Sequence, residues 1–447
     1  MRPTFGTDGL RGVANSELTP ELALAVGRAA ARVLSAEGFL VGRDTRVSGA
    51  VLQSALVAGM ASEGAEVVDL GVLPTPGVAL LAADRGRAAA VVSASHNPFA
   101  DNGIKLFGHG GVKLDEATEA RIEAELDAVL AAGADGAGRP TGAGVGRITS
   151  DPAAAGDYIA HLIGTVDGLR LDGRRVVVDC ACGAASAVAP AVLRALGADT
   201  EVIADRPDGL NINDGCGSTH PDRLRRRVVE VGAEVGLALD GDADRVLMVD
   251  ASGELVDGDQ LMALLALDML ARGALPASTV AVTVMSNLGF RLAMEEAGVH
   301  VHETPVGDRH ILAALEENGW ALGGEQSGHI ILRRLSPTGD GLLTGLQVLA
   351  VMTRSGRSLA DLAAAGMVRL PQELRSVRVA RPKALPESTD VWDEVAAVEG
   401  ELSGRGRVLV RASGTEPVVR VMVEAPEPDT AQRAVDRICR VVEAALS

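Results

Sequence analysis

The stretch that most constrains the fold is Val235-Gly-Leu-Ala-Leu-Asp240-Gly-Asp-Ala-Asp-Arg245-Val-Leu-Met-Val-Asp250. Its two apolar halves have the length and composition of buried strands. Between them, the acidic loop (residues 240–244) carries carboxylates at Asp240, Asp242 and Asp244. The stretch therefore predicts two strands joined by a polar loop.

The acidic loop favours a bound cation. Carboxylates at alternate positions of one turn repel one another unless a positive charge neutralises them. An oxygen-only ligand set with few members favours Mg²⁺, which keeps sites for water and phosphate. An EF-hand is excluded because Arg245 and Ala251 stand where that motif needs glycine and glutamate. The alternative is a solvated acidic turn without an ion.

The sequence on either side repeats an alternation of short apolar runs and longer helical stretches. A Gly-rich segment at 133–146 contains no G-x-G-x-x-G and is expected to be a surface loop near the first domain boundary. Beyond Leu370-Pro371 the remaining chain predicts a small α+β domain. Strands are expected at 39–41, 66–70, 88–92, 175–179, 201–204, 279–285, 375–379, 407–410 and 418–424, and helices at 51–61, 115–130, 187–196, 258–271, 288–297, 341–352 and 429–445.

Length and composition predict a globular protein of several domains. A chain of 447 residues has room for about three domains, and 47% apolar with 23% charged residues fits folded cores. The pattern itself predicts three α/β units followed by the small α+β unit. We expect these domains at residues 1–150, 151–252, 253–368 and 369–447.

The charge balance disfavours two classes of partner. With 42 Lys and Arg against 60 Asp and Glu, the net charge is −18, so neither nucleic acid nor an anionic membrane is an expected partner. The four cysteines show neither zinc-finger nor C-x-x-C spacing, and the N-terminus has no apolar signal region. No apolar run reaches the roughly 18 to 20 residues of a membrane span. We expect a soluble, cytoplasmic protein.

A second candidate segment is the Ser95 loop (residues 93–98), which ends the apolar run 88–92. Serine here can be a turn former. No G-x-S-x-G surrounds it, so a hydrolase nucleophile fits poorly. A phosphoryl-accepting serine fits better, because that chemistry needs a hydroxyl, a metal and a basic residue. Lys105, one of only three lysines, can supply the positive charge.

Two further segments carry ligand-binding chemistry. Arg411-Ala-Ser413-Gly414-Thr415 and Arg420 combine arginines, hydroxyls and a glycine, as a phosphate site does. No Gly-Lys dipeptide occurs, so a nucleotide P-loop is excluded. A structural turn with incidental arginines is the alternative. Glu325, Ser327 and His329 lie in a polar, glycine-flanked loop whose carboxylate and hydroxyl suit sugar hydroxyls.

Taken in order, these segments resemble the α-D-phosphohexomutase superfamily along essentially the whole chain. The branch that acts on glucosamine phosphates is indicated by Asn211-Ile-Asn-Asp-Gly-Cys-Gly-Ser-Thr-His-Pro221 and by Gln326. The resemblance is carried by Phe5-Gly-Thr-Asp-Gly-Leu-Arg-Gly12, Gly42-Arg-Asp-Thr-Arg-Val-Ser-Gly49, the Ser95 loop, the acidic loop, Val306-Gly-Asp-Arg309, the Glu325 segment and the Ser413 segment.

The resemblance implies a fold and a set of roles. The fold has three topologically similar mixed α/β domains and a C-terminal helix-on-sheet domain around a central cleft. Ser95 would be phosphorylated and would bind Mg²⁺ together with Asp240, Asp242 and Asp244. Arg11, Lys105 and Arg245 would act at the reacting centre, with Lys105 as candidate general base. The substrate-binding residues implied are Glu325, Ser327, His329, Arg411, Ser413, Gly414, Thr415 and Arg420.

The reaction implied is an isomerisation of a hexosamine phosphate. Glucosamine 6-phosphate and glucosamine 1-phosphate would interconvert through phospho-Ser95 and a 1,6-bisphosphate, which also serves as activator, supplying amino sugar for UDP-N-acetylglucosamine and the cell wall. The alternative is a phosphomannomutase or phosphoglucomutase activity with the same residues. A homodimer is an expectation of the family. Whether an activating kinase or the enzyme itself first phosphorylates Ser95 stays open.

Overall fold

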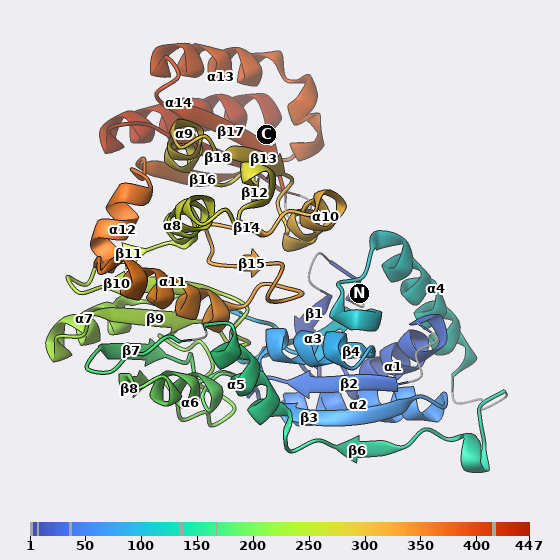
Figure 1. Cartoon of the computed structure of the whole chain (residues 1–447). Helices are drawn as coiled ribbons and strands as arrows, with labels where there is room; N and C mark the ends of the chain where they lie inside the picture. The colour runs from blue at the N-terminus through green and yellow to red at the C-terminus, as the bar shows by residue number, and fades with distance from the viewer. Residues whose placement is uncertain (1–2, 7–8, 35–37, 134–137, 167, 414–416) are drawn as a thin grey trace. The chain divides into compact units, whose positions relative to one another are not determined.

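The computed structural model describes residues 3–6, 9–34, 38–133, 138–166, 168–413 and 417–447. In this described part, the strands form sheets of six, five, four and three strands. The chain divides into two compact units, residues 1–284 with 299–363 (unit 1) and residues 285–298 with 364–447 (unit 2). The three larger sheets belong to unit 1 and the smallest to unit 2 (Figure 1).

The first sheet has the order β1-β5-β4-β2-β3-β6. Strands β2, β3, β4 and β6 run parallel, whereas β5 pairs antiparallel with both β1 and β4. The strands are β1 (Leu10–Val13), β2 (Gly38–Arg43), β3 (Glu66–Val72), β4 (Ala88–Val92), β5 (Asp101–Phe107) and β6 (Ile148–Ser150), and the helices are α1 (Pro20–Leu34), α2 (Gly49–Ser62), α3 (Thr75–Asp84) and α4 (Glu116–Ala132).

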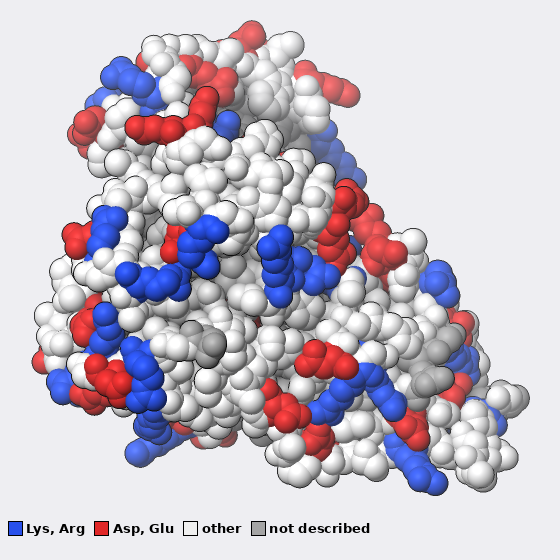
Figure 2. Space-filling model, in the orientation of Figure 1, with Lys and Arg blue, Asp and Glu red and all other residues white. Residues whose placement is uncertain are grey.

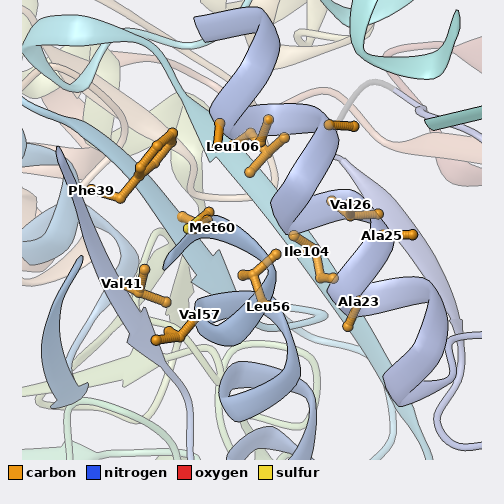
Figure 3. Packing of buried hydrophobic residues seen from close by; sticks show 14 of the residues in the cluster. Ala23, Ala25, Val26, Phe39, Val41, Leu56, Val57, Met60, Ile104 and Leu106 are labelled. Atoms are coloured by element: carbon orange, nitrogen blue, oxygen red, sulfur yellow. The ribbon is translucent and has the colours of Figure 1, made fainter. Parts of the chain in front are cut away.

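The core of this part packs β2, β5 and the first two helices together. Phe39 of β2, Met60 of α2 and Ile104 of β5 are fully buried and lie in one cluster (Figure 3). Helices α1 and α2 approach closely at two glycines. A Cβ at Gly27 or Gly59 would lie 2.1 Å from a backbone oxygen of the facing helix, so this crossing admits no side chain at either position.

The second sheet has the order β11-β10-β9-β7-β8 and carries the acidic loop. Strands β9 and β10 pair antiparallel, and the loop joins them beyond the pair Leu239 and Val246. The strands are β7 (Arg175–Asp179), β8 (Asp199–Ile203), β9 (Val235–Leu239), β10 (Val246–Asp250) and β11 (Leu255–Val256), and the helices are α5 (Ala154–Gly164), α6 (Val188–Ala195) and α7 (Asp222–Val231).

The third sheet has the order β13-β12-β14-β15, and its β14–β15 connection contains Glu325, Ser327 and His329. Figure 2 shows acidic and basic side chains both scattered over the face in view. No helix in the described ranges is long and apolar enough to cross a bilayer. The strands are β12 (Thr279–Thr283), β13 (His300–Thr304), β14 (Leu322–Gly324) and β15 (Ile330–Leu332), and the helices are α8 (Gly258–Ala271), α10 (Asp308–Asn318), α11 (Gly341–Ser355) and α12 (Leu359–Gly366).

Unit 2 is a sheet in the order β16-β18-β17 with helices packed on it. Helix α9 (Leu288–Glu296) lies between β12 and β13 in the chain but belongs to unit 2. The N–H of Leu288 donates to the buried carboxylate of Glu424 at 2.9 Å, which ties α9 to the sheet. The other elements are β16 (Gln372–Arg378), β17 (Arg407–Ala412), β18 (Val418–Glu424), α13 (Thr389–Leu402) and α14 (Pro428–Leu446).

Candidate active site

Ser95 follows β4 and lies beside the acidic loop, although the two segments are far apart in sequence. Its side chain is buried, and its Oγ donates to Oδ2 of Asp240 at 2.5 Å. Its Oγ also lies 3.3 Å from Nδ1 of His96. Burial, with the positive charges of Arg245 and Arg11, lowers the pKa of His96 to about 4. The ring is therefore neutral at pH 7.

The three carboxylates of the acidic loop converge. Ligand oxygens of Asp240, Asp242 and Asp244 all lie within 4.8 Å of one another, and all three side chains are buried. Burial, then repulsion from the other two carboxylates, raises the pKa of Asp240 well above its usual range. Oδ1 of Asp242 is buried and accepts no hydrogen bond from any residue that the structure describes. A buried acidic cluster with an unused oxygen fits a divalent cation, since a cation would neutralise it.

Lys105 of β5 neutralises part of this charge. Its Nζ lies 2.8 Å from Oδ2 of Asp242 and 3.1 Å from Oδ2 of Asp244. Thr75, at the start of α3, donates its hydroxyl to the same Asp242 oxygen at 2.6 Å. Burial opposes ionisation of Asp244, but Lys105 and His329 outweigh it, so the pKa of Asp244 lies well below its usual range.

His329 lies between two carboxylates at the far side of the acidic loop. Its Nδ1 is 3.7 Å from Asp244 Oδ1, and its Nε2 is 3.7 Å from Asp308 Oδ2. Burial disfavours the charged ring, yet Asp244, Asp308 and Glu325 outweigh burial and raise the pKa of His329. Gly339 lies against the ring, and a Cβ at that position would be only 2.4 Å from Nε2. The ring is thus held in place beside the metal-ligand candidates.

A cavity of about 360 Å³ opens in front of these groups. Its wall combines basic, acidic and imidazole groups with glycines, which suits a polar, anionic ligand of sugar-phosphate size. Nη1 of Arg11 donates to Asn97 Oδ1 at 3.2 Å, and Ser327 Oγ donates to Glu325 Oε2 at 3.3 Å. The charged and imidazole residues that line the cavity are Arg11, His96, Asp244, Arg245, Asp308, Glu325 and His329.

Unit 2 carries a pair of arginines on neighbouring strands. Arg411 of β17 is directly opposite Arg420 of β18 in the register of the sheet. Burial, and then the charge of Arg420, lowers the pKa of Arg411. Two facing cations repel each other, and a bound anion would relieve that repulsion. Ser413 N–H donates to Val418 O at 2.9 Å, whereas Gly414 and Thr415, also predicted here, lie outside the described residues.

The structure brings most of the predicted unit 1 residues together. Ser95, Lys105 and the acidic loop form the buried base, and Arg11, Arg245, Glu325 and His329 line the adjoining cavity. Ser327 lies next to them through its bond to Glu325.

Sequence reasoning missed several supporting groups. Thr75 gave no signal, since a threonine before a proline reads as a helix start. Asp308 was present in the Val306-Gly-Asp-Arg309 segment but received no role. Arg46 and Asn213 also stand in quoted segments, and both donate to the backbone of the Ser95 loop. Asp308, Arg46 and Asn213 all lie in segments that carry the family resemblance, and this is the signal that could have identified them.

Comparisons with known proteins show to which family the chain is similar. Models of phosphoglucomutase/phosphomannomutase α/β/α domains I, II and III match residues 2–132, 156–253 and 257–370, and the C-terminal domain model matches 374–441. A phosphoglucosamine mutase from Rhodococcus jostii is 52% identical, covering 99% of each chain. One from Saccharopolyspora erythraea is 53% identical, covering 99% of this chain and 100% of the relative.

Solved structures share the fold over the full length. A phosphoglucomutase/phosphomannomutase family protein from Burkholderia thailandensis has a TM-score of 0.82 at 25% identity, covering 100% of this chain and 98% of that one. Aspergillus fumigatus N-acetylphosphoglucosamine mutase, in complex with GlcNAc-6P and magnesium, has a TM-score of 0.70 at 18% identity, covering 100% and 96%. From the domain matches and the full-length relatives, the chain belongs to the phosphoglucomutase/phosphomannomutase family of α-D-phosphohexomutases.

Proposed function

We propose that the chain is a phosphoglucosamine mutase, which interconverts glucosamine 6-phosphate and glucosamine 1-phosphate. The observation that carries this proposal is the Ser95 hydroxyl beside a buried acidic cluster, in a chain whose full-length relatives named above are phosphoglucosamine mutases. The phosphomannomutase or phosphoglucomutase alternative is less favoured, since those relatives carry the glucosamine name at 52–53% identity.

Ser95 would carry the phosphoryl group between the two positions of the sugar. In the forward direction, the bond from Ser95 Oγ to phosphorus breaks as a bond from O1 of glucosamine 6-phosphate forms. The resulting 1,6-bisphosphate would then return its 6-phosphoryl group to Ser95, leaving glucosamine 1-phosphate. A free bisphosphate of this kind would also serve as activator, because it can phosphorylate an unmodified Ser95.

Asp240, Asp242 and Asp244, with an oxygen of phospho-Ser95, would hold Mg²⁺. The fit rests on converging carboxylate oxygens and on the unused Oδ1 of Asp242. A bound Mg²⁺ would neutralise negative charge on the phosphoryl group during transfer. Lys105 lies against two of the same carboxylates and adds positive charge there.

Arg11, Arg245 and His329 would act on the substrate from the cavity wall. The two arginines line the cavity and would offset the phosphoryl charge. Lys105 is the candidate general base for the proton of the attacking sugar hydroxyl, and His329, next to the acidic loop, would bind the substrate. Glu325 and Ser327 would accept and donate hydrogen bonds to sugar hydroxyls, with His329 next to them.

Arg411, Ser413 and Arg420 of unit 2 would bind a substrate phosphate, together with Gly414 and Thr415. The facing arginines support this role, because their mutual repulsion favours an anion. Each hexosamine phosphate carries one phosphate that does not react in a given step, and it needs its own site. Small hexosamine phosphates are thus the proposed partners, and a homodimer, an activating kinase and a cytoplasmic role in cell-wall precursor supply stay predictions.

A comparison of substrates tests the proposal. The purified chain is assayed with glucosamine 6-phosphate, glucose 6-phosphate and mannose 6-phosphate, under one Mg²⁺ concentration and with a trace of sugar 1,6-bisphosphate. We expect the highest kcat/KM with glucosamine 6-phosphate. A higher value with glucose or mannose phosphate would replace the proposal by the corresponding alternative, and no turnover of any of the three would refute a mutase.

A further inference from the structure

One segment that indicates the glucosamine branch has no role in the reaction described so far. It contains Asn213, a buried residue with 7% exposure. Asn213 Nδ2 donates to the backbone oxygen of Ser95 at 2.9 Å and to that of Asn97 at 3.0 Å. Asn213 belongs to the connection between β8 and α7, whereas Ser95 and Asn97 follow β4. A single amide therefore joins two sheets of unit 1 at the proposed nucleophile.

The conformation held by this amide is strained. Ser95 has φ 51°, in the left-handed region that a residue with a Cβ rarely adopts. Such a conformation costs on the order of 1 kcal/mol and persists only where its surroundings determine it. The Ser95 N–H donates to Ser93 Oγ at 3.0 Å. Hydrogen bonds thus hold the residue on its N–H side and on its carbonyl side.

The two carbonyls receive a second donor from the first sheet. Arg46 Nη2 lies 2.6 Å from the Asn97 oxygen and 3.2 Å from the Ser95 oxygen. Arg46 is itself paired with buried Asp44, which accepts a hydrogen bond from Ser93 at 2.6 Å. The first sheet alone therefore fixes one side of the Ser95 loop, and Asn213 supplies the matching donor from the second sheet.

The acidic loop packs against this junction. A Cβ placed on Gly241 would lie 2.6 Å from the Ser95 oxygen and 2.9 Å from Asn213 Nδ2. The acidic loop, the Ser95 carbonyl and the Asn213 amide thus meet with no room for another atom. The Asn213 amide therefore lies where the Ser95 loop and the acidic loop meet.

We infer that Asn213 is a positioning residue that sets the Ser95 hydroxyl against the acidic loop. This inference rests on the proposed function, since it explains how the phosphoryl carrier is aligned. Misplacement of a reacting group by about 1 Å can cost about 100-fold in rate. Loss of the amide donors should therefore slow phosphoryl transfer while substrate affinity, set by the cavity wall, changes little.

Two variants separate alignment from folding. Asn213→Asp keeps the shape but turns an oxygen toward two carbonyls, which repels them. Asn213→Gly removes the amide and tolerates the left-handed backbone of this position, φ 58°. The matched control is Asn211→Asp, because Asn211 lies two residues away and, among the described residues, its side chain bonds only Asp208 N–H and Arg206 O.

The measurement is single-turnover transfer from phospho-Ser95 to glucosamine 6-phosphate, with KM and thermal stability recorded for each variant. We expect transfer to slow at least about tenfold in both Asn213 variants, with KM within about threefold of wild type. The Asn211→Asp control should transfer at the wild-type rate. Should Asn213→Asp fail to fold, Asn213→Gly carries the test.

Two results overturn the inference. One is a folded Asn213→Gly variant that transfers the phosphoryl group at the wild-type rate. The other is a fall in the transfer rate no larger than the unfolded fraction explains, or no larger than the fall in Asn211→Asp. Failure of the proposed function is a different result, because the wild-type chain itself would then turn over no hexose phosphate. An active wild type with an equally active Asn213→Gly leaves the proposed function standing and removes only the positioning role.

Discussion

The hydroxyl of Ser95 donates a hydrogen bond to Oδ2 of Asp240, 2.5 Å away, across 145 positions of sequence. The hydroxyl follows β4 of the first sheet, and the carboxylate follows β9 of the second. The proposed phosphoryl carrier and the proposed metal ligands therefore meet only when both sheets are folded and packed. Mutations at this junction should affect catalysis before they affect the folding of either sheet.

Replacing Asp242 by Asn tests the metal role. Loss of one of three converging carboxylates should lower kcat by on the order of 100-fold and raise the Mg²⁺ concentration for half-maximal activity. Thermal stability measured in EDTA should fall little, since Lys105 keeps Asp244 as partner. Activity against Mg²⁺ concentration and a melting curve measure both. Asp199→Asn, at an exposed ion pair with Arg175, is the control; a variant that unfolds yet stays fully active per folded molecule contradicts the role.

Removal of divalent cations should destabilise the protein as well as inactivate it. The acidic cluster is buried and its carboxylates repel one another, so a bound cation stabilises the folded state. Binding at about 100 times Kd contributes about 2.7 kcal/mol. Melting curves with EDTA, and then with excess Mg²⁺, should show a reversible fall and recovery of Tm. Equal Tm under both conditions would argue that the acidic loop binds no ion.

Asp340 predicts a pH effect on stability away from the cavity. It caps α11 by accepting from Leu343 N–H at 2.9 Å, and it accepts from the buried Tyr158 hydroxyl at 2.8 Å. Burial raises the pKa of Asp340 from 3.8 to about 6. Because the pKa of Asp340 is higher in the folded state than in the unfolded state, the protonated carboxyl stabilises the fold. This contribution to stability is fully present below about pH 4 and is lost as pH rises through 6.

The variant Asp340→Asn should therefore be more stable than wild type at pH 7.5. Asparagine keeps the cap and removes a buried charge, and a shift of about two pH units corresponds to about 3 kcal/mol. The advantage should shrink on going to pH 4.5. Denaturant unfolding of both proteins at the two pH values gives the stability difference between variant and wild type at each pH. A stability difference that does not depend on pH would mean that Asp340 titrates normally.

The arginine pair of unit 2 predicts an effect on substrate affinity. Replacing Arg420 by Ala removes one charge facing Arg411, so a bound phosphate loses a charge-assisted hydrogen bond. KM for glucosamine 6-phosphate should rise by about tenfold or more, with a smaller change in kcat. Steady-state kinetics measure both, with exposed Arg405→Ala as the control. An unchanged KM would remove Arg420 from the phosphate site.

The strands and helices with clear periodicity were predictable. Residues 88–92 and 175–179 form strands and 258–271 a helix, at the predicted bounds. Helix α3 was missed because almost all its residues are buried, so it shows no polar face. Strand β5 was missed because it carries buried polar residues. Asn102 and Lys105 are satisfied by Ser48 and by Asp242, partners that lie far away in sequence.

The chemistry of their segments predicts Ser95, Lys105 and the acidic loop, and the family resemblance adds Arg11 and Arg245, but neither predicts how these residues are arranged. Three carboxylates in one turn predict a cation site from sequence alone. That Lys105 pairs with two of them depends on how two sheets pack, which no local pattern records. The same holds for the His329 ring between Asp244 and Asp308. The assignment of roles to these residues stays a prediction.

The central claim is that Ser95 carries the transferred phosphoryl group. The direct measurement is intact mass of phosphorylated enzyme mixed with one equivalent of glucosamine 6-phosphate and Mg²⁺, with sugar phosphates quantified in the same samples. We predict that the enzyme loses one phosphoryl group as one bisphosphate forms, and that Ser95→Ala never carries the group and is inactive. Formation of glucosamine 1-phosphate by the Ser95→Ala variant, or loss of the phosphoryl group from the enzyme without formation of the bisphosphate, would contradict the account.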